Sequence, residues 1–348
     1  MSANRKQKNN GAVVLKSKEQ IRAERIDKIK DACRISVLIL AGLLLFNRIF
    51  FHIRLPEAYK AFSVFGVGFE PYAELNQNEA VVYFFDTGQS DCSLIMTEKH
   101  NVLIDGGDLD SGNIITGALK ALGAEHLDYV LISHPHVDHF GGMTEIFGNF
   151  SVGKVLMPCI PDDMIPRTYN YSKILAALEI YDIQHEFVKA GDRFSLGDSV
   201  LEIAAPVYND YSELNNLSIV ARFVHGENAF LFTGDLEQSA ERDILENGAN
   251  IGAKALKVGH HGSAGSSSTD FLKSISPEIA VAEAGIYNIY GHPRSEIIER
   301  LSVVGCSEFC STSLNGNIAI ISDGKGLRVL TEKNSALSLE VFGEVPQN

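Results

Sequence analysis

The sequence predicts an α/β fold preceded by a membrane-anchor helix, and three observations support this prediction. Several short apolar runs have the character of buried strands, and one of them is followed by a glycine pair that starts a helix. These runs end in residues that can bind metal ions. A basic leader and an apolar segment near the N-terminus indicate the anchor.

The N-terminal segment has the features of a single membrane span. An apolar stretch runs from Ile35 to Phe46, interrupted by Ser36 alone, and continues beyond Arg48 to Ile53. This length is close to the ~20 residues that cross a bilayer, and the Arg48 side chain can extend to the interface. A cleaved signal peptide is the main alternative, but no small-x-small cleavage site follows. A buried helix of a soluble protein is a third interpretation.

Charge sets the orientation of this anchor. Ten Lys or Arg residues against four Asp or Glu give residues 1–34 a charge of +6, and since the whole chain carries −14, residues 35–348 carry −20. The positive-inside rule keeps the leader in the cytoplasm, so we expect a single-pass protein of the cell membrane with an extracytoplasmic domain. The predicted boundaries are leader 1–34, transmembrane anchor 35–53, linker 54–80, globular domain 81–331 and C-terminal tail 332–348.

The densest group of candidate metal ligands follows the apolar run 127–133. Within six positions stand four ligand side chains: His134, His136, Asp138 and His139. The two histidines at i and i+2 can face one cation, while Asp138 and His139 can face a second. Imidazole nitrogens and carboxylate oxygens suit zinc, manganese or iron, and no thiolate lies close by. The sequence therefore predicts a hydrolytic metal site with open coordination positions.

Three further apolar runs end in similar residues: 102–107 contains Asp105, 229–235 ends in Asp235, and 256–263 contains His260 and His261. Asp105, followed by two glycines, is placed to orient a ligating histidine from behind. Asp235 can bridge two metal ions.

This order of motifs resembles the metallo-β-lactamase superfamily of metal-dependent hydrolases and, more narrowly, the hydrolase domain of ComEC-type competence DNA-uptake proteins. The motifs that carry the narrower likeness are Phe-Asp-Thr-Gly-Gln-Ser-Asp at 85–91, the histidine-rich loop, Thr-Gly-Asp-Leu-Glu at 233–237, His-His-Gly-Ser at 260–263 and Tyr-Gly-His-Pro at 290–293. The likeness runs from about Val81 to Leu330. It implies an αββα sandwich of two similar halves, whose strand-end loops meet at the metals.

The resemblance also implies roles for individual residues. His134 and His136 would hold the first metal ion, and Asp138 and His139 the second. Asp235 would bridge the two ions, and one residue of the pair 260–261, with His260 preferred, would complete the second site. The implied cofactor is one or two divalent ions, Zn²⁺ or Mn²⁺.

Two positions depart from the superfamily pattern. Asn216 stands where many members place a further histidine at the first metal, and an amide oxygen is a poorer ligand, although ComEC-type domains also tend to have asparagine here. Ser90 replaces a usual glycine but leaves Asp91 available. Together with Asp86 and Ser263, Asp91 is expected beside the ligands or the substrate.

The expected chemistry is hydrolysis by metal-activated water. A metal pair lowers the pKa of bound water toward ~7 and stabilises charge on the attacked group. Asp138 would bind metal and hold the resulting hydroxide, and His292, in a Gly-His-Pro turn, would contact the substrate or protonate the leaving group. An ordinary turn histidine is the alternative for His292, and an ordinary loop serine for Ser263.

The predicted function is therefore that of a membrane-anchored, extracytoplasmic, metal-dependent phosphodiesterase, with a nuclease acting on DNA as the activity that the resemblance implies. No cluster of Lys or Arg lies outside the leader, so tight binding of duplex DNA is not expected. Two alternatives are a hydrolase of a non-nucleic substrate (a cell-wall phosphodiester, an ester or a lactam) and a catalytically weak binding domain. The sequence predicts no particular protein partner.

Overall fold

The structure, a computed structural model, describes residues 75–333 except residue 77. The predicted leader, the anchor at 35–53 and most of the linker and tail therefore lie outside the described residues. Within the described part, none of the helices combines the length and the hydropathy needed to span a bilayer.

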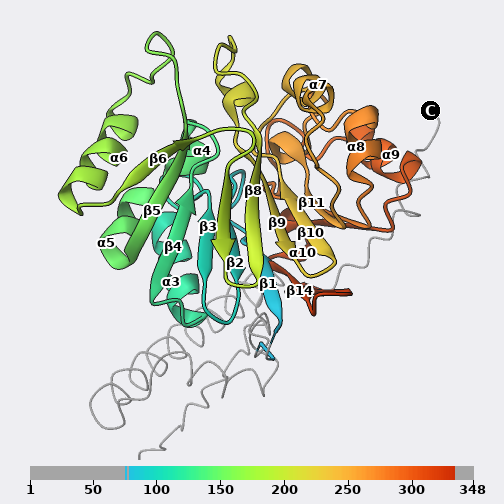
Figure 1. The fold of residues 1–348 in the computed structure, drawn as a ribbon, viewed down its shortest axis with the longest axis horizontal. Helices are drawn as coiled ribbons and strands as arrows, with labels where there is room; N and C mark the ends of the chain where they lie inside the picture. Colours follow the sequence, from blue (N-terminus) through green and yellow to red (C-terminus); the bar gives the residue numbers. More distant parts are fainter. Residues whose placement is uncertain (1–74, 77, 334–348) are drawn as a thin grey trace, which may run out of the picture. The chain divides into compact units, whose positions relative to one another are not determined.

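Two β-sheets form the centre of the described chain (Figure 1). The first has the strand order β15 (Leu327–Thr331), β14 (Ile318–Ser322), β1 (Ala80–Phe84), β2 (Ser93–Met96), β3 (Asn101–Ile104), β4 (His126–Leu131), β5 (Ser151–Pro158) and β6 (His185–Val188). The second has the order β13 (Glu308–Ser311), β12 (Ile279–Ala282), β11 (Ala255–Lys257), β10 (Asn228–Phe232), β9 (Val220–His225), β8 (Ser199–Ala205) and β7 (Arg193–Leu196). Strands β3 to β6 pair in parallel, and so do β10 to β13.

Helices cover the outer face of each sheet (Figure 1). On the first sheet lie α3 (Gly112–Ala121), α5 (Met143–Asn149) and α6 (Tyr169–Ile180), and on the second α7 (Gln238–Asn247), α8 (Thr269–Ile275) and α9 (Ser295–Val303). The connecting loops contain α4 (Val137–Phe140), α10 (Thr312–Asn315) and two 3₁₀ turns, Leu214–Leu217 and Gly259–Gly262. The predicted sandwich of two sheets with helices outside is confirmed.

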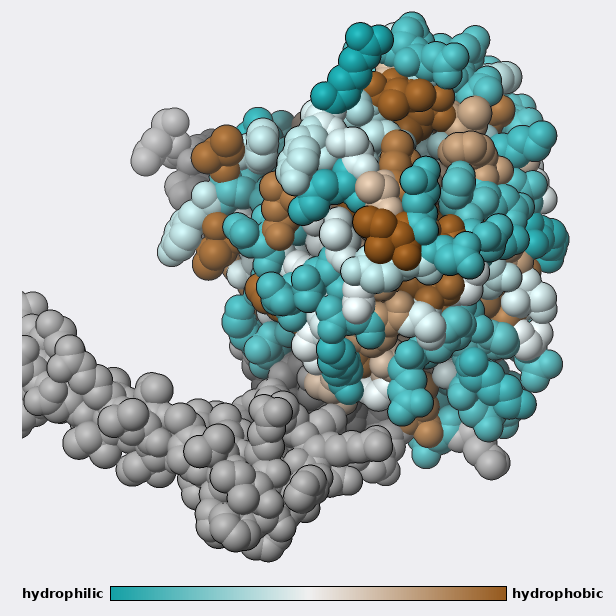
Figure 2. Space-filling model, turned by 90° about the vertical axis from the view of Figure 1, so that its left-hand side faces the viewer, coloured by the Kyte–Doolittle hydropathy of each residue, from teal (hydrophilic) through white to brown (hydrophobic). Residues whose placement is uncertain are grey.

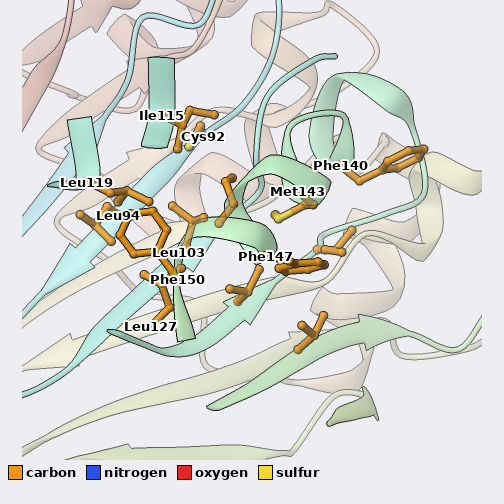
Figure 3. Close-up of a cluster of buried hydrophobic side chains, with 14 of the residues drawn as sticks. Cys92, Leu94, Leu103, Ile115, Leu119, Leu127, Phe140, Met143, Phe147 and Phe150 are labelled. Atoms are coloured by element: carbon orange, nitrogen blue, oxygen red, sulfur yellow. The ribbon is translucent and has the colours of Figure 1, made fainter. Parts of the chain in front are cut away.

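Alternate side chains of strand β1 pack into two different hydrophobic cores. Val81 and Tyr83 pack toward the helices, whereas Val82 and Phe84 pack between the sheets, because successive side chains point to opposite faces. Figure 3 labels part of the core on the helix side: Cys92, Leu94, Leu103, Ile115, Leu119, Leu127, Phe140, Met143, Phe147 and Phe150. Since both faces are covered, the strand is apolar throughout rather than alternating with polar residues.

The loops that carry the candidate ligands follow β3, β4, β10 and β11. Each of the four apolar runs predicted as strands overlaps one of these strands, and α5 begins directly after the predicted Gly-Gly pair. The segment predicted as a ligand loop already contains the short helix α4, which carries Asp138 and His139. A backbone hydrogen bond joins loops of the two sheets, because Ile219 N donates to Ser133 O at 2.9 Å. The strand ends of both sheets therefore contribute to one site.

The outer surface is largely hydrophilic. Figure 2 looks onto the side of the molecule that carries α5 and α6, and shows hydrophobic side chains in separate patches among hydrophilic ones. Exposed apolar residues of α6 and of the following strand include Leu175, Ile180 and Phe187. Scattered apolar exposure of this kind is ordinary for a folded domain.

Candidate metal centre

Glycines bring the histidine-rich loop close to the end of β3. Gly141 N donates to Gly107 O at 2.9 Å, and Gly106 N donates to His139 O. A Cβ on Gly142 would lie 2.4 Å from Gly106 O, so a side chain there would push the two loops apart. The Gly-Gly pair after the ligands is thus required by backbone packing, which places α4 against the strand end that carries Asp105.

His139 is held by a carboxylate behind it. Its Nδ1 donates to Asp105 Oδ2 at 2.8 Å, and the same carboxylate accepts hydrogen bonds from Ser133 N and Ser133 Oγ, both at 2.8 Å. The other ring nitrogen, Nε2, points away from Asp105 and lies 3.3 Å from Asp235 Oδ1. A carboxylate that fixes one imidazole nitrogen leaves the other free to bind metal. Asp105 is therefore placed as predicted, behind a candidate ligand.

Four side chains form a compact group around this nitrogen. Asp138, His139, Asp235 and His261 each offer one ligand atom, and these atoms all lie within 4.8 Å of one another. His261 Nε2 lies 3.4 Å from Asp138 Oδ2 and 3.6 Å from Asp235 Oδ2. Three buried atoms of the group have no hydrogen-bond partner: His139 Nε2, Asp235 Oδ1 and His261 Nε2. Such converging, unpartnered nitrogen and oxygen atoms fit a divalent cation.

The pKa shifts in this group show that its carboxylates stabilise positive charge in the site. Although burial opposes it, the carboxylates of Asp235 and Asp105 hold the pKa of His139 well above its usual range. Burial also opposes the shift at His261, yet Asp235 and Asp91 raise its pKa to about 10. Conversely, burial alone would raise the pKa of Asp235, but His139 and His261 hold it well below its usual value. Because metal ions bind deprotonated imidazole and carboxylate groups, a cation bound by this group would compete with protons.

His134 and His136 lie next to this group. Their rings share a hydrogen bond of 2.9 Å between His134 Nε2 and His136 Nδ1, and His134 Nε2 lies 4.0 Å from Asp235 Oδ2. Burial, followed by the charge of His139, holds the pKa of His134 well below its usual range. A neutral imidazole has a lone pair for a metal ion. Asn216 lies in the 3₁₀ turn 214–217, and its Oδ1 accepts from Glu237 N at 3.2 Å.

The two histidines of the 260–261 pair face different surroundings. Both have left-handed backbone angles, with φ of 51° at His260 and 54° at His261. The His260 side chain is 28% exposed, and its Nε2 lies 3.5 Å from Asp235 Oδ2. His261 is buried, and its Nδ1 donates to the carbonyl oxygen of Glu283 at 2.9 Å, which directs Nε2 into the compact group. The geometry thus brings together His261, rather than the preferred His260, with Asp138 and Asp235.

Behind His261 lies a buried set of charges. Asp91 Oδ1 is 3.0 Å from His261 Nδ1, and Asp91 Oδ2 forms an ion pair with Lys257. Although burial opposes it, Asp91 raises the pKa of Lys257 to about 12. Burial, followed by Asp91, raises the pKa of Glu283 to about 8, and the Glu283 carboxyl accepts from Cys92 N at 3.0 Å and Ser93 Oγ at 3.1 Å. Asp91 therefore lies beside the candidate ligand His261, on the side away from the compact group.

Sequence reasoning missed Lys257 and Glu283. Lys257 is the last residue of β11, and Glu283 directly follows β12; the other residues of both strands are apolar. A charged residue inside a buried apolar run is itself a signal, because burying a charge is costly unless it is paired.

Of the remaining predicted residues, His292 lies beside the centre, whereas Ser263 and Asp86 make other contacts. His292 Nδ1 lies 3.4 Å from Gln89 Nε2, and burial followed by the charge of His261 lowers the pKa of His292 to about 4. Ser263 Oγ accepts from Gly265 N at 3.3 Å within its own turn. Asp86 faces elsewhere: its Oδ2 lies 3.5 Å from Lys333 Nζ, and its backbone N–H donates to Asn317 Oδ1.

Comparison with known proteins defines the class. The sequence profile of the metallo-beta-lactamase superfamily matches residues 85–285, more than half of the chain, so the protein belongs to this superfamily, whose fold is that of metal-dependent hydrolases. It is similar to ComE operon protein 3 of Bacillus subtilis (29% identity, 64% of this chain and 31% of that protein) and to competence protein ComA of Neisseria gonorrhoeae (32%, 72% and 33%). The chain spans about a third of the length of these relatives. The predicted resemblance to ComEC-type proteins is confirmed.

Two solved structures align with the chain at low sequence identity. The metallo-beta-lactamase fold protein YhfI of Bacillus subtilis aligns with a TM-score of 0.45 at 11% identity, over 71% of this chain and 100% of that chain. The diiron beta-hydroxylase CmlA of Streptomyces venezuelae aligns with a TM-score of 0.45 at 15% identity, over 74% and 55%.

Proposed function

We propose that the protein is a metal-dependent phosphodiesterase that cleaves nucleic-acid strands. The observation that carries this proposal is the compact group of Asp138, His139, Asp235 and His261, with three unpartnered ligand atoms in a buried site. The competence proteins among its relatives support a DNA-related role.

The proposed ligand sets follow the geometry. His134 and His136 would hold one ion, Asp138, His139 and His261 the other, and Asp235 would lie between them; His260, at the exposed edge, would contact ligand or substrate. Bound divalent ions would lower the pKa of a water molecule toward ~7 and offset charge on the phosphoryl group.

The remaining residues position these ligands and the substrate. Asp105 fixes the His139 ring, and Asp91 with the backbone of Glu283 fixes the His261 ring. The Asp138 side chain is 34% exposed, so it can reach both a ligand position and the water that attacks the substrate. His292 lies at the open side, where it can contact the substrate or its leaving group.

The substrate and location belong to the same proposal. Residues 35–348 carry a net charge of −20, which disfavours the extensive backbone contacts that duplex binding requires. Short or single-stranded substrates are therefore favoured. The proposed location is the outer side of the cell membrane, held by the N-terminal segment at 35–53.

The test uses the full chain, stripped of metal and resupplied with Mn²⁺ or Zn²⁺. We expect metal-dependent hydrolysis of bis(p-nitrophenyl) phosphate and of single-stranded DNA, lost in His136→Ala. Cleavage of the small diester without cleavage of DNA would contradict the nuclease assignment and favour a cell-wall or other small diester. Folded, metal-loaded protein that cleaves neither substrate would contradict the phosphodiesterase proposal and favour an ester, lactam or binding function.

A further inference from the structure

An exposed apolar loop adjoins the candidate metal centre. Between β12 and α9, four large side chains within five positions are largely in solvent: Ile286 (62% exposed), Tyr287 (95%), Ile289 (92%) and Tyr290 (57%). This density differs from the scattered apolar residues on the side of α5 and α6 (Figure 2). Contiguous exposed apolar residues mark a surface that binds another molecule.

The loop is a closed structure rather than a frayed segment. Asn288 Nδ2 donates to Gly285 O at 2.8 Å and to His292 O at 2.6 Å, and Asn288 Oδ1 accepts from His292 N at 2.9 Å. The half-buried Asn288 amide thus ties the two ends of the loop together. The apolar side chains flanking this amide are left in solvent, and Tyr287 adopts a left-handed backbone with φ of 57°. A non-glycine residue in this region carries strain, which is a common feature of functional loops.

The opening motif holds the base of the loop next to the site. Gly285 N donates to Gln89 Oε1 at 3.0 Å, while Gln89 Nε2 lies 3.4 Å from His292 Nδ1. A Cβ on Gly285 would lie 2.8 Å from Gln89 N, so only glycine permits this approach. At the C-terminal end of the loop, Arg294 N donates to Gly262 O at 2.9 Å. Arg294 is an exposed residue, and its guanidinium group lies beside Gly291 of the loop.

A series of stacked rings leads from the loop to the metal centre. The Tyr290 ring stacks on His292 with centroids 5.6 Å apart and planes at 26°, and His292 stacks on His261 at 6.5 Å and 23°. These separations are typical of attractive ring pairs. His261 in turn lies 3.6 Å from Asp235. The rings of Tyr290 and His292 therefore connect the exposed loop to His261 of the centre.

We propose that Tyr290, assisted by Tyr287, stacks an unpaired base of a nucleic-acid strand beside the scissile phosphodiester, with Arg294 available to a neighbouring phosphate. This inference rests on the proposed phosphodiesterase function. Bases within a duplex are already stacked and cannot lie on an exposed tyrosine, whereas single strands bind aromatic side chains in this way. Stacking also suits a strongly acidic protein, because it does not depend on a basic surface.

The kinetic test compares two esters with the same leaving group, thymidine 5′-(p-nitrophenyl phosphate) and methyl p-nitrophenyl phosphate. For the full chain, we expect kcat/KM to favour the thymidine ester by about 5- to 150-fold, the range for one stacked base. In Tyr290→Ala this ratio should fall toward one, and in Tyr290→Phe it should persist. Tyr169→Ala, an exposed tyrosine on α6, is the matched control and should keep the wild-type ratio.

A second test uses the absence of tryptophan from the sequence. Tyr290→Trp makes a single-tryptophan protein whose fluorescence reports on the loop, and we expect thymidine 5′-monophosphate to quench it. Tyr169→Trp should not respond. An emission maximum typical of buried tryptophan and insensitive to the nucleotide would show that lipid or a second copy of the chain covers the loop, and would overturn the inference.

The outcomes separate the inference from the proposed function. A wild-type protein that hydrolyses both esters with equal kcat/KM, or a ratio unchanged in Tyr290→Ala, would overturn base stacking and leave the phosphodiesterase intact. A wild-type protein that hydrolyses neither ester in the presence of metal would contradict the phosphodiesterase itself.

Discussion

The two sheets each supply a histidine-bearing loop to the metal centre, but they hold the histidine in different ways. After β4, His139 is fixed by the side chain of Asp105, which ends the neighbouring strand β3. After β11, His261 is fixed by a backbone carbonyl, that of Glu283, with Asp91 beside it. The first loop depends mainly on Asp105, with Asp91 Oδ2 3.7 Å from the same ring nitrogen, and the second depends on backbone geometry and a buried ion network. Equivalent substitutions should therefore have different consequences in the two halves.

Asp235 lies close to the histidines of both loops, so its substitution should have the largest effect on activity. Its Oδ1 lies 3.3 Å from His139 Nε2 and its Oδ2 lies 3.6 Å from His261 Nε2. Removing a residue that orients a ligand typically costs about 10–100-fold, and removing the ligand should cost more. In Asp235→Asn we expect kcat/KM on bis(p-nitrophenyl) phosphate to fall by more than about a hundredfold. Asp270→Asn, an exposed carboxylate on α8, should behave as wild type.

Metal content distinguishes the cause of that loss. If Asp235 bridges two ions, Asp235→Asn should retain less metal after dialysis than Asp270→Asn. An active Asp235→Asn protein with a full complement of metal would show that the two loops do not share a ligand.

On the His261 side of the site, Asp91→Asn should chiefly lower the stability of the protein. The substitution leaves Lys257 buried without its anionic partner, and breaking a buried pair from one side costs about 3–5 kcal/mol. We expect this decrease in the free energy of unfolding, measured by urea denaturation of the metal-free full chain.

A double-mutant cycle sharpens this prediction. Asp91→Asn combined with Lys257→Met removes both charges, so it should be more stable than the sum of the two single changes indicates. If the stability losses of the two single variants add up to that of the double variant, the interaction between Asp91 and Lys257 does not stabilise the protein.

On the His139 side of the site, Asp105→Asn should chiefly lower the affinity for metal ions. An amide at this position cannot accept from Ser133 and His139 as the carboxylate does, so the ring orientation is lost. We expect the affinity for Mn²⁺, measured by calorimetry, to fall about 10–100-fold. Asp110→Asn, in the exposed part of the same loop, is the control. A loss of stability as large as that of Asp91→Asn, with metal affinity unchanged, would refute the contrast between the halves.

This contrast also determines what the sequence could predict. The candidates of the first half lie within six positions after an apolar run, so their proximity is local and visible in the chain. Asp105 was predicted beside this loop because it ends an apolar run before two glycines, and the parallel pairing of β3 with β4 places it there.

The second half depends on contacts that form only in the folded chain. Glu283 and Cys92 are far apart in sequence, and their hydrogen bond exists because β12 ends beside the opening motif. Which residue of the pair 260–261 faces the centre is set by two left-handed backbone angles, which residue types do not reveal. Asp86 shares the opening motif with Asp91 yet pairs with Lys333, since the turn between them directs the two carboxylates apart.

The smallest effect on stability is expected at Glu241, which holds the segment after the histidine pair. Glu241 of α7 accepts hydrogen bonds from Ser267 N and Ser268 N, in the segment that follows the histidine pair. In Glu241→Gln the amide nitrogen cannot accept, and one unsatisfied backbone donor costs about 1–3 kcal/mol.

The pH dependence of this cost tests its origin. Burial raises the pKa of Glu241 above its ordinary value of 4.5, so the folded protein holds a proton that the unfolded chain releases. The contribution of Glu241 to stability is therefore complete below pH 4.5 and declines as the pH rises through the folded pKa. The difference in unfolding free energy between wild type and Glu241→Gln should be largest at low pH. Glu246→Gln, exposed on the same helix, should show no such trend, and an equal slope in both variants would argue against a buried, protonated Glu241.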